Sequence, residues 1–158
     1  IESEAITLIN PTKTGYTFAG WTGTDLTGAT STVTIAKGST GERSYTAMWT
    51  INEYTITWSI DGVETTETYA YGATPAHADP TKAADAQYTY TFTGWSPEIA
   101  TVTADATYTA QFSSTVNTYT ITWSIDGVET AETYEYGATP AHADPTKAAD
   151  AQYTYTFT

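Results

Sequence analysis

"YTITWSIDGVETTETYAY", residues 54–71, is the stretch that decides the fold. From Tyr54 to Ile60, large apolar side chains alternate with hydroxyl-bearing ones, which is the period-two pattern of a strand with one buried face. Asp61-Gly62 follows, a dipeptide that tolerates the positive φ angles of a type I′ turn. Residues 63–71 continue the alternation, so we expect an antiparallel hairpin.

Two further segments alternate in the same way, residues 88–92 and residues 107–112. With the hairpin, they predict a mainly β fold of small four-stranded units. Asp79-Pro80 is a suitable N-cap and first helical residue, so residues 81–86 are expected to form at most a short helical turn. Residues 31–35 are expected to form an added strand, and residues 113–118 a short polar connector between units.

The hairpin belongs to a tandem repeat. Residues 54–93 recur as residues 119–158 with two differences, Thr66 against Ala131 and Ala70 against Glu135. We therefore divide the chain into the C-terminal half of a divergent repeat (1–52), a complete repeat (53–118) and the N-terminal part of a third, truncated repeat (119–158). Because the sequence begins within the pattern and without a methionine, we expect it to be a piece of a longer polypeptide.

Composition excludes several classes of function. The 158 residues carry 18 Asp and Glu against 5 Lys and Arg, a net charge of −13 that repels nucleic acid and anionic lipid surfaces. No apolar run approaches the length of a membrane span, so no membrane insertion is expected. The absence of cysteine removes disulfides, zinc-thiolate sites and thiol catalysis.

The aromatic side chains are assigned to the core rather than to a binding surface. A repeat of this size without disulfides has a core contributing roughly 3–5 kcal/mol and needs its large side chains inside. The predicted structural core comprises Tyr16, Phe18, Trp21, Trp49, Tyr54, Ile56, Trp58, Tyr90, Phe92, Trp95, Tyr108, Phe112, Tyr119, Ile121 and Trp123.

A family resemblance follows from the segments Pro11–Lys13, Gly15–Trp21, Tyr45–Trp49 and Tyr54–Trp58. The most specific element is Tyr-Thr-Phe-x-Gly-Trp, found at residues 16–21 and, with Thr before the Gly, at residues 90–95. The chain resembles the Listeria-Bacteroides repeat, the B-repeat family of internalin-type bacterial surface proteins. The resemblance implies β-grasp-like (ubiquitin-like) modules in tandem on exported proteins, and it brings no catalytic residues.

Four polar features have alternative interpretations. His77 and His142 are one loop position in two copies, with no second His or Cys to complete a metal or catalytic site. Asp79, Asp85 and Asp105 could form a calcium site, but the sequence lacks the spacing of a calcium loop. Glu64 and Glu67 are interpreted as charges that protect an edge strand from sheet stacking. A Lys-Asn or Thr-Gln cross-link is a further alternative, which an intact mass would reveal.

The combined expectation is a non-enzymatic, extracellular spacer on a bacterial cell surface, with no cofactor and no catalytic or metal site. Its partners would be neighbouring repeats, with self-association by strand addition at the truncated ends. The alternative is an adhesive module that binds a host protein or glycan through Tyr69, Tyr71, Trp95 and Tyr108.

Overall fold

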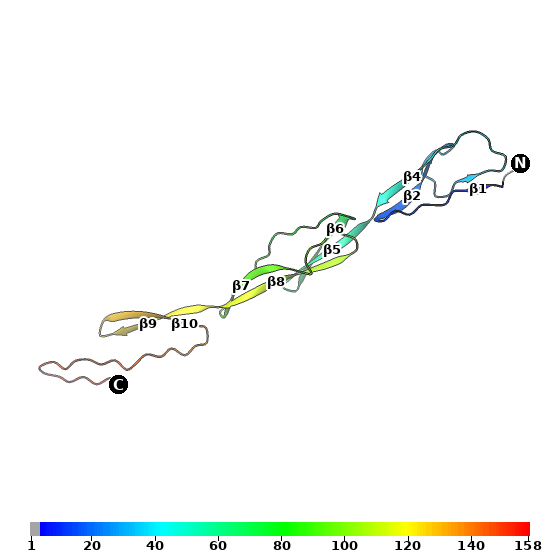
Figure 1. Cartoon of the computed structure of the whole chain (residues 1–158). Coiled ribbons are helices and arrows are strands. Elements are labelled where there is room, and N and C mark those ends of the chain that lie inside the picture. Colours follow the sequence, from blue (N-terminus) through cyan, green and yellow to red (C-terminus); the bar gives the residue numbers. More distant parts are fainter. Residues whose placement is uncertain (1–3) are drawn as a thin grey trace. The chain divides into compact units, whose positions relative to one another are not determined.

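A computed structural model describes residues 4–158, and every regular element within that range is a strand. The mainly β fold is therefore confirmed, and the first three residues of the predicted 1–52 repeat lie outside the described residues. The strands (Figure 1) are β1 (Ile6–Thr7), β2 (Tyr16–Gly23), β3 (Thr34–Ile35), β4 (Tyr45–Ile51), β5 (Glu53–Ile60), β6 (Val63–Ala70), β7 (Tyr88–Ser96), β8 (Ala106–Val116), β9 (Thr118–Ile125) and β10 (Val128–Glu135).

The largest sheet has four strands in the order β6-β5-β8-β7. β5 pairs with β6 in antiparallel orientation, and on its other side it pairs with β8 in parallel, from Ile56 opposite Ala106 to Ser59 opposite Thr109. The strand order places the parallel pair at the centre, so β5 has a hydrogen-bonded neighbour on each side. A central strand has a neighbouring strand on each side. A segment rich in Ile and Trp, such as β5, is therefore expected to be buried there.

The predicted hairpin is confirmed. Asp61 and Gly62 have φ angles of 50° and 84°, as a two-residue type I′ turn requires, and Ile60 stands opposite Val63. The third repeat forms the same hairpin, with β9 and β10 paired from Ile125 opposite Val128 to Thr118 opposite Glu135. Identical local sequence therefore produces identical local structure in both copies.

No helical turn forms at residues 81–86, where at most a short one was expected. Residues 73–85 carry no regular element. The loop instead closes on Asp85, whose Oδ1 accepts hydrogen bonds from the backbone N–H groups of Gln87 at 2.8 Å and Tyr88 at 2.7 Å. This Asx turn uses the carboxylate to begin β7, and the Asp79-Pro80 signal does not start a helix.

Two other expectations need correction. Of residues 31–35, Thr34–Ile35 alone is a strand, and it pairs with β1. The polar connector at residues 113–118 is strand rather than loop, because β8 continues to Val116 and β9 begins at Thr118, leaving Asn117 between them. The Ser, Thr and Val of this stretch are compatible with a pleated conformation, so polarity alone misled the prediction.

The chain divides into two compact units, Ile1–Asp79 with Gly94–Gln111, and Pro80–Thr93 with Phe112–Thr158. The buried hydrophobic side chains of the described residues all belong to the first unit. They are Val33, Ile56, Trp58, Val102, Tyr108 and Ala110. In the second unit aromatic rings meet in pairs, such as Phe92 and Phe112 with centroids 5.8 Å apart. The predicted repeat boundaries stay a prediction.

Candidate functional site: an indole cluster closed by a carboxylate

A hydrophobic core cluster surrounds Trp58 of β5. Trp58 is completely buried, and its ring centroid lies 4.8 Å from that of Trp95, 5.0 Å from His77 and 5.3 Å from Tyr108. These distances are those of favourable aromatic pairs. Because β5 carries Trp58 into the centre of the four-stranded sheet, three separate segments of the chain converge on one indole.

The polar edge of this indole is satisfied by Glu67 on β6. Trp58 Nε1 donates a hydrogen bond to Glu67 Oε2 at 3.0 Å, and the Tyr69 hydroxyl donates to the same oxygen at 2.7 Å. The hydrogen bond from Tyr69, then that from Trp58, lowers the pKa of Glu67 below its ordinary value. Glu67 was expected to act as a protective charge on an edge strand. It also accepts a hydrogen bond from the buried Trp58, and the sequence interpretation missed this role.

His77 has a structural position. Its ring packs against Trp58 and, with centroids 5.2 Å apart, against Trp95, while Nδ1 lies 2.7 Å from the Ala78 carbonyl oxygen. The half-buried His77 thus fills space between two indoles, an arrangement suited to packing.

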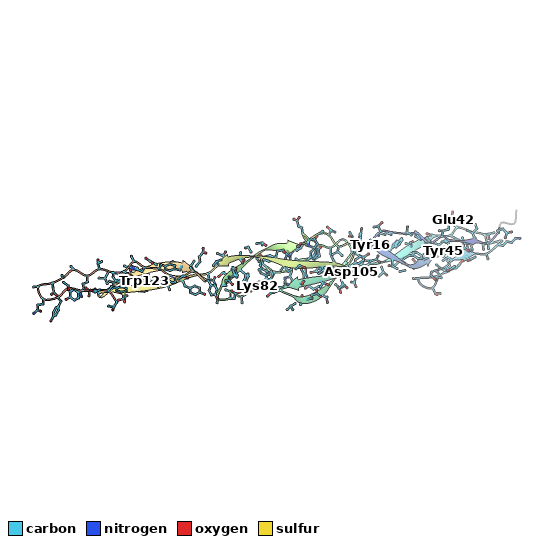
Figure 2. All side chains as sticks on the ribbon, turned by 90° about the horizontal axis from the view of Figure 1, so that it is seen from below. Tyr16, Glu42, Tyr45, Lys82, Asp105 and Trp123 are labelled. Atoms are coloured by element: carbon cyan, nitrogen blue, oxygen red, sulfur yellow. The ribbon has the colours of Figure 1, made fainter. Side chains whose placement is uncertain are left out.

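The third repeat repeats this arrangement. Trp123, labelled in Figure 2, donates from Nε1 to Glu132 Oε2 at 3.0 Å, and the Tyr134 hydroxyl donates to the same oxygen. His142 lies 5.0 Å from Trp123, as His77 does from Trp58. Hydrogen bonds from Tyr134 and Trp123, in that order, lower the pKa of Glu132. A network reproduced in both copies is a property of the repeat.

Two of the three aspartates that could have formed a calcium site, Asp85 and Asp105, have hydrogen-bond partners in the fold. Asp105 Oδ1 accepts the Thr55 N–H at 2.8 Å, and Asp85 Oδ2 accepts the Tyr90 hydroxyl at 2.8 Å in addition to its turn contacts. Between residues 4 and 158, no group of three or more His, Asp or Glu side chains is arranged to hold a metal ion. The carboxylates of Asp85 and Asp105 instead accept hydrogen bonds from backbone and hydroxyl donors.

Burial separates the predicted core residues into three groups. Ile56, Trp58 and Tyr108 are buried, and Tyr119 is at the surface with 47% of its area exposed. The half-buried residues are Tyr16, Phe18, Trp21, Trp49, Tyr54, Tyr90, Phe92, Trp95, Phe112, Ile121 and Trp123. The Tyr119 hydroxyl donates a hydrogen bond to the Ala86 carbonyl at 2.6 Å.

Sequence reasoning did not place Val102, which is 2% exposed and packs against the buried cluster. Its backbone accepts from the Gly72 N–H and donates to the Ala73 carbonyl, both at 2.8 Å. The only signal was an isolated apolar residue between short polar ones, and that pattern does not distinguish a loop anchor from a surface residue.

Two of the four aromatics proposed for a glycan-binding platform point into the fold. Tyr108 is 4% exposed, and its hydroxyl accepts the Ala100 N–H at 3.1 Å. Tyr71 lies over Gly15, where an added Cβ would stand 2.0 Å from the ring. Trp95 and Tyr69 are partly buried against the core cluster. None of the four side chains is therefore fully exposed.

Comparison with known proteins finds a partial sequence similarity. Residues of this chain match Internalin H of Listeria monocytogenes serovar 1/2a at 38% identity over 86 residues. Over half its length, the chain is similar to a listerial internalin. The match covers 54% of this chain and 15% of the relative, so the chain corresponds to a small part of that protein. No family model matches the chain. No solved structure matches it either.

Across the described part of the chain, no helix has the length and apolar character needed to cross a membrane.

Proposed function

We propose that the chain is a non-enzymatic spacer region of an extracellular bacterial surface protein, built from tandem β-grasp-like repeats. The similarity to an internalin supports the surface assignment. The sheet order β6-β5-β8-β7, with the parallel pair in the middle, supports the β-grasp-like description, with the helix of that architecture replaced by an extended loop.

The observation that carries the proposal is the connection between repeats. We call the single residue that separates the last strand of one repeat from the first strand of the next the joint. β4 and β5 are separated by Asn52 alone, and β8 and β9 by Asn117 alone. Asn52 donates its N–H to the Gly15 carbonyl at 2.9 Å, and its own carbonyl accepts the Tyr71 N–H at 2.8 Å. Asn52 is thus bonded to the residue just before β2 and to the residue just after β6.

The second joint has the same bonds. Asn117 donates its N–H to the Gln87 carbonyl, and its carbonyl accepts the Tyr136 N–H, both at 2.8 Å. The side-chain oxygens also correspond, because the Thr17 hydroxyl donates to Asn52 and the Thr89 hydroxyl to Asn117. A spacer requires the same connection at every junction, and here the connection is independent of the differing loops around it.

Charge is compatible with this role. Residues 54–118 contain seven acidic side chains against Lys82, a net charge of −6 for the repeat. Copies of one sign repel each other and stay soluble. The clusters around Trp58 and Trp123 use their polar atoms internally, which suits a structural module better than a site that must bind something else.

A copy-number series tests the proposal. Chains carrying one, two or four additional copies of residues 54–118 would be measured by small-angle X-ray scattering, and we expect the maximum dimension to rise by a constant increment per copy. The control is the same series with Asn117→Gly at each joint, in which the increase in maximum dimension per copy should no longer be constant. Saturable binding to a glycan array by the parent chain would instead support the adhesive alternative.

A further inference from the structure

The outer edge of β6 carries open backbone groups although the four-stranded sheet is fully formed. The order β6-β5-β8-β7 makes β6 an edge strand, and among the described residues its strand partner is β5 alone. In a two-residue hairpin the residues that flank the turn form a hydrogen-bonded pair, here Ile60 and Val63, and bonded pairs alternate along the ladder. The N–H and C=O groups of Glu64, Thr66 and Thr68 therefore point away from β5, as on any unpaired edge.

One face of this hairpin carries a carboxylate at each end. The side chains of Glu64, Thr66 and Thr68 share that face because they are two residues apart. Glu64 lies next to the turn, and at the far end Glu53 of β5 stands opposite Ala70 of β6. Both carboxylates are exposed, and in the part of the chain that the structure describes neither has a hydrogen-bond or ion-pair partner. Six residues of extended strand, about 20 Å, separate the two ends of this acidic face.

The third repeat keeps the two acidic ends with different residues. Glu129 corresponds to Glu64 and is also exposed. At the far end the pair is reversed, because Glu135 is on the edge strand β10 and Thr118 stands opposite it on β9. The carboxylate has thus changed strand, and the face still has one acid at each end.

The two differences between the aligned copies both lie on this edge strand and on this face. Ala131 replaces Thr66, and Glu135 replaces Ala70. Both positions are an even number of residues from Glu64, so they share its face. The turn and the opposite face of the strand are identical in the two copies. The sequence difference is therefore confined to the surface that an added strand would contact.

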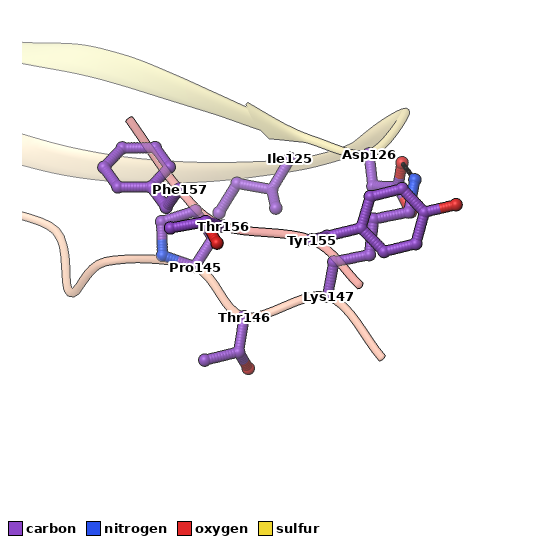
Figure 3. Close-up of a pocket in the computed structure, with 8 residues that line it drawn as sticks. All are labelled: Ile125, Asp126, Pro145, Thr146, Lys147, Tyr155, Thr156 and Phe157. Atoms are coloured by element: carbon purple, nitrogen blue, oxygen red, sulfur yellow. Dashed lines mark hydrogen bonds and ion pairs between the residues drawn. The ribbon is translucent and has the colours of Figure 1, made fainter. Parts of the chain in front are cut away.

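Lys147 does not neutralise the acidic face of the third repeat. Its Nζ pairs with Asp126 Oδ1 at 2.6 Å, at the turn between β9 and β10 (Figure 3). The same ammonium group lies 4.7 Å from the centroid of the Tyr155 ring. Glu129 and Glu135 have no hydrogen-bond or ion-pair partner within the described residues. These two carboxylates are thus available to a cation from outside the chain.

Charge and backbone together indicate which partner this edge accepts. An added strand gains main-chain hydrogen bonds from the outward groups of β6, and its side chains pair with their neighbours across the ladder. Like charges directly opposite each other destabilise such a ladder, and opposite charges stabilise it. A second copy of this acidic repeat is therefore disfavoured, whereas an extended segment with basic side chains is complementary.

We propose that the outer edges of β6 and β10 accept an extended basic segment of a partner protein as an added antiparallel strand. Two basic side chains of the segment, six residues apart, stand beside the acidic ends of the face, and its main chain bonds to the residues between them. Because Glu135 is on the edge strand and Glu53 is one strand further in, the β10 edge holds the segment more tightly. This surface is separate from the cluster around Trp58, and the proposal does not depend on the spacer proposal.

The test titrates the full chain with the peptide Lys-Val-Thr-Val-Thr-Val-Lys and follows the backbone amides by NMR, which resolves the two edges separately. We expect saturable shifts on β6 and β10 with a Kd below about 1 mM, tighter at β10. The matched peptide with Glu in place of both Lys residues should bind at least about tenfold more weakly. Absence of saturable shifts at about 1 mM, equal binding of the two peptides, or shifts confined to other strands would overturn the proposal.

Two charge variants separate a local contact from general electrostatic attraction. Glu64→Lys reverses one end of the β6 face, and Glu98→Lys makes the same change in net charge at an exposed residue after β7. We expect Glu64→Lys to weaken binding at β6 at least about tenfold and to spare β10, and Glu98→Lys to spare both edges. Equal weakening by the two variants would overturn the proposal.

Two further variants test the backbone bonds and the position of the second acid. Thr66→Pro removes an outward N–H from an edge strand, where proline is tolerated, so β6 should lose binding while circular dichroism shows that the strands remain. Ala70→Glu places on β6 the acid that β10 carries at Glu135, and it should tighten binding at β6 roughly threefold. Retained binding at β6 in folded Thr66→Pro, or weaker binding in Ala70→Glu, would contradict strand addition at this edge.

Discussion

Replacing Trp58 by alanine tests whether the indole cluster is the core of the complete repeat. The side chain is completely buried and touches three rings. A buried Trp removes about 150–250 Å² from water, which at about 25 cal/mol per Å² corresponds to about 4–6 kcal/mol as an upper bound. Measured truncations of buried aromatic residues cost about 3–5 kcal/mol, so we expect about 4 kcal/mol.

The assay is hydrogen exchange of the β5 and β8 amides, because it reports opening of this region separately from the rest of the chain. A loss of about 4 kcal/mol accelerates exchange roughly a thousandfold, unless the region unfolds completely. Trp123→Ala is the matched control, since the same residue in the same hairpin is only half-buried and should cost less than half as much. Equal effects of the two substitutions would refute the argument that partner strands decide their burial.

Three further predictions concern single contacts. Gly15→Ala, at φ +77° under Tyr71, should lower stability by more than about 2 kcal/mol in a denaturant titration, and Gly62→Ala in open space by about 1 kcal/mol. Because the pKa of Glu67 is lowered in the folded state, Glu67 stabilises the fold above pH 4.5, and this contribution is lost as the pH falls through its folded pKa. Glu67→Gln should therefore reduce the loss of stability at low pH, as followed by circular dichroism. Asn117→Ala removes two side-chain hydrogen bonds of 2.7 Å and should speed β7 amide exchange by roughly tenfold.

The strands and the turn were predictable because their determinants are local. Alternation from Tyr54 to Ile60 marks β5, and Asp61-Gly62 supplies the two positive φ angles of the turn. The optional helical turn at residues 81–86 does not form, although its signal was also local. There the Asp85 carboxylate captures two backbone donors, and this competing turn begins β7 directly.

The candidate site was only partly predictable. Glu67 is nine residues from Trp58, yet the hairpin register places it diagonally across β5 and β6, within reach of the indole. The register could have revealed that pair. His77 and Val102 reach the cluster through loops, and no periodic pattern in the sequence indicates where a loop residue will lie.

The sequence by itself determined the repeat, the hairpins and the turn chemistry, because each depends on residues close together in the chain. Tertiary structure decided the parallel pairing of β5 with β8 and, through it, which side chains are buried. Trp58 and Trp123 illustrate this difference. They have the same neighbours in the sequence and lie in equivalent hairpins, and their indoles donate to equivalent residues, Glu67 and Glu132. Trp58 is completely buried and Trp123 is half-buried, because burial depends on a strand contributed by a distant part of the sequence.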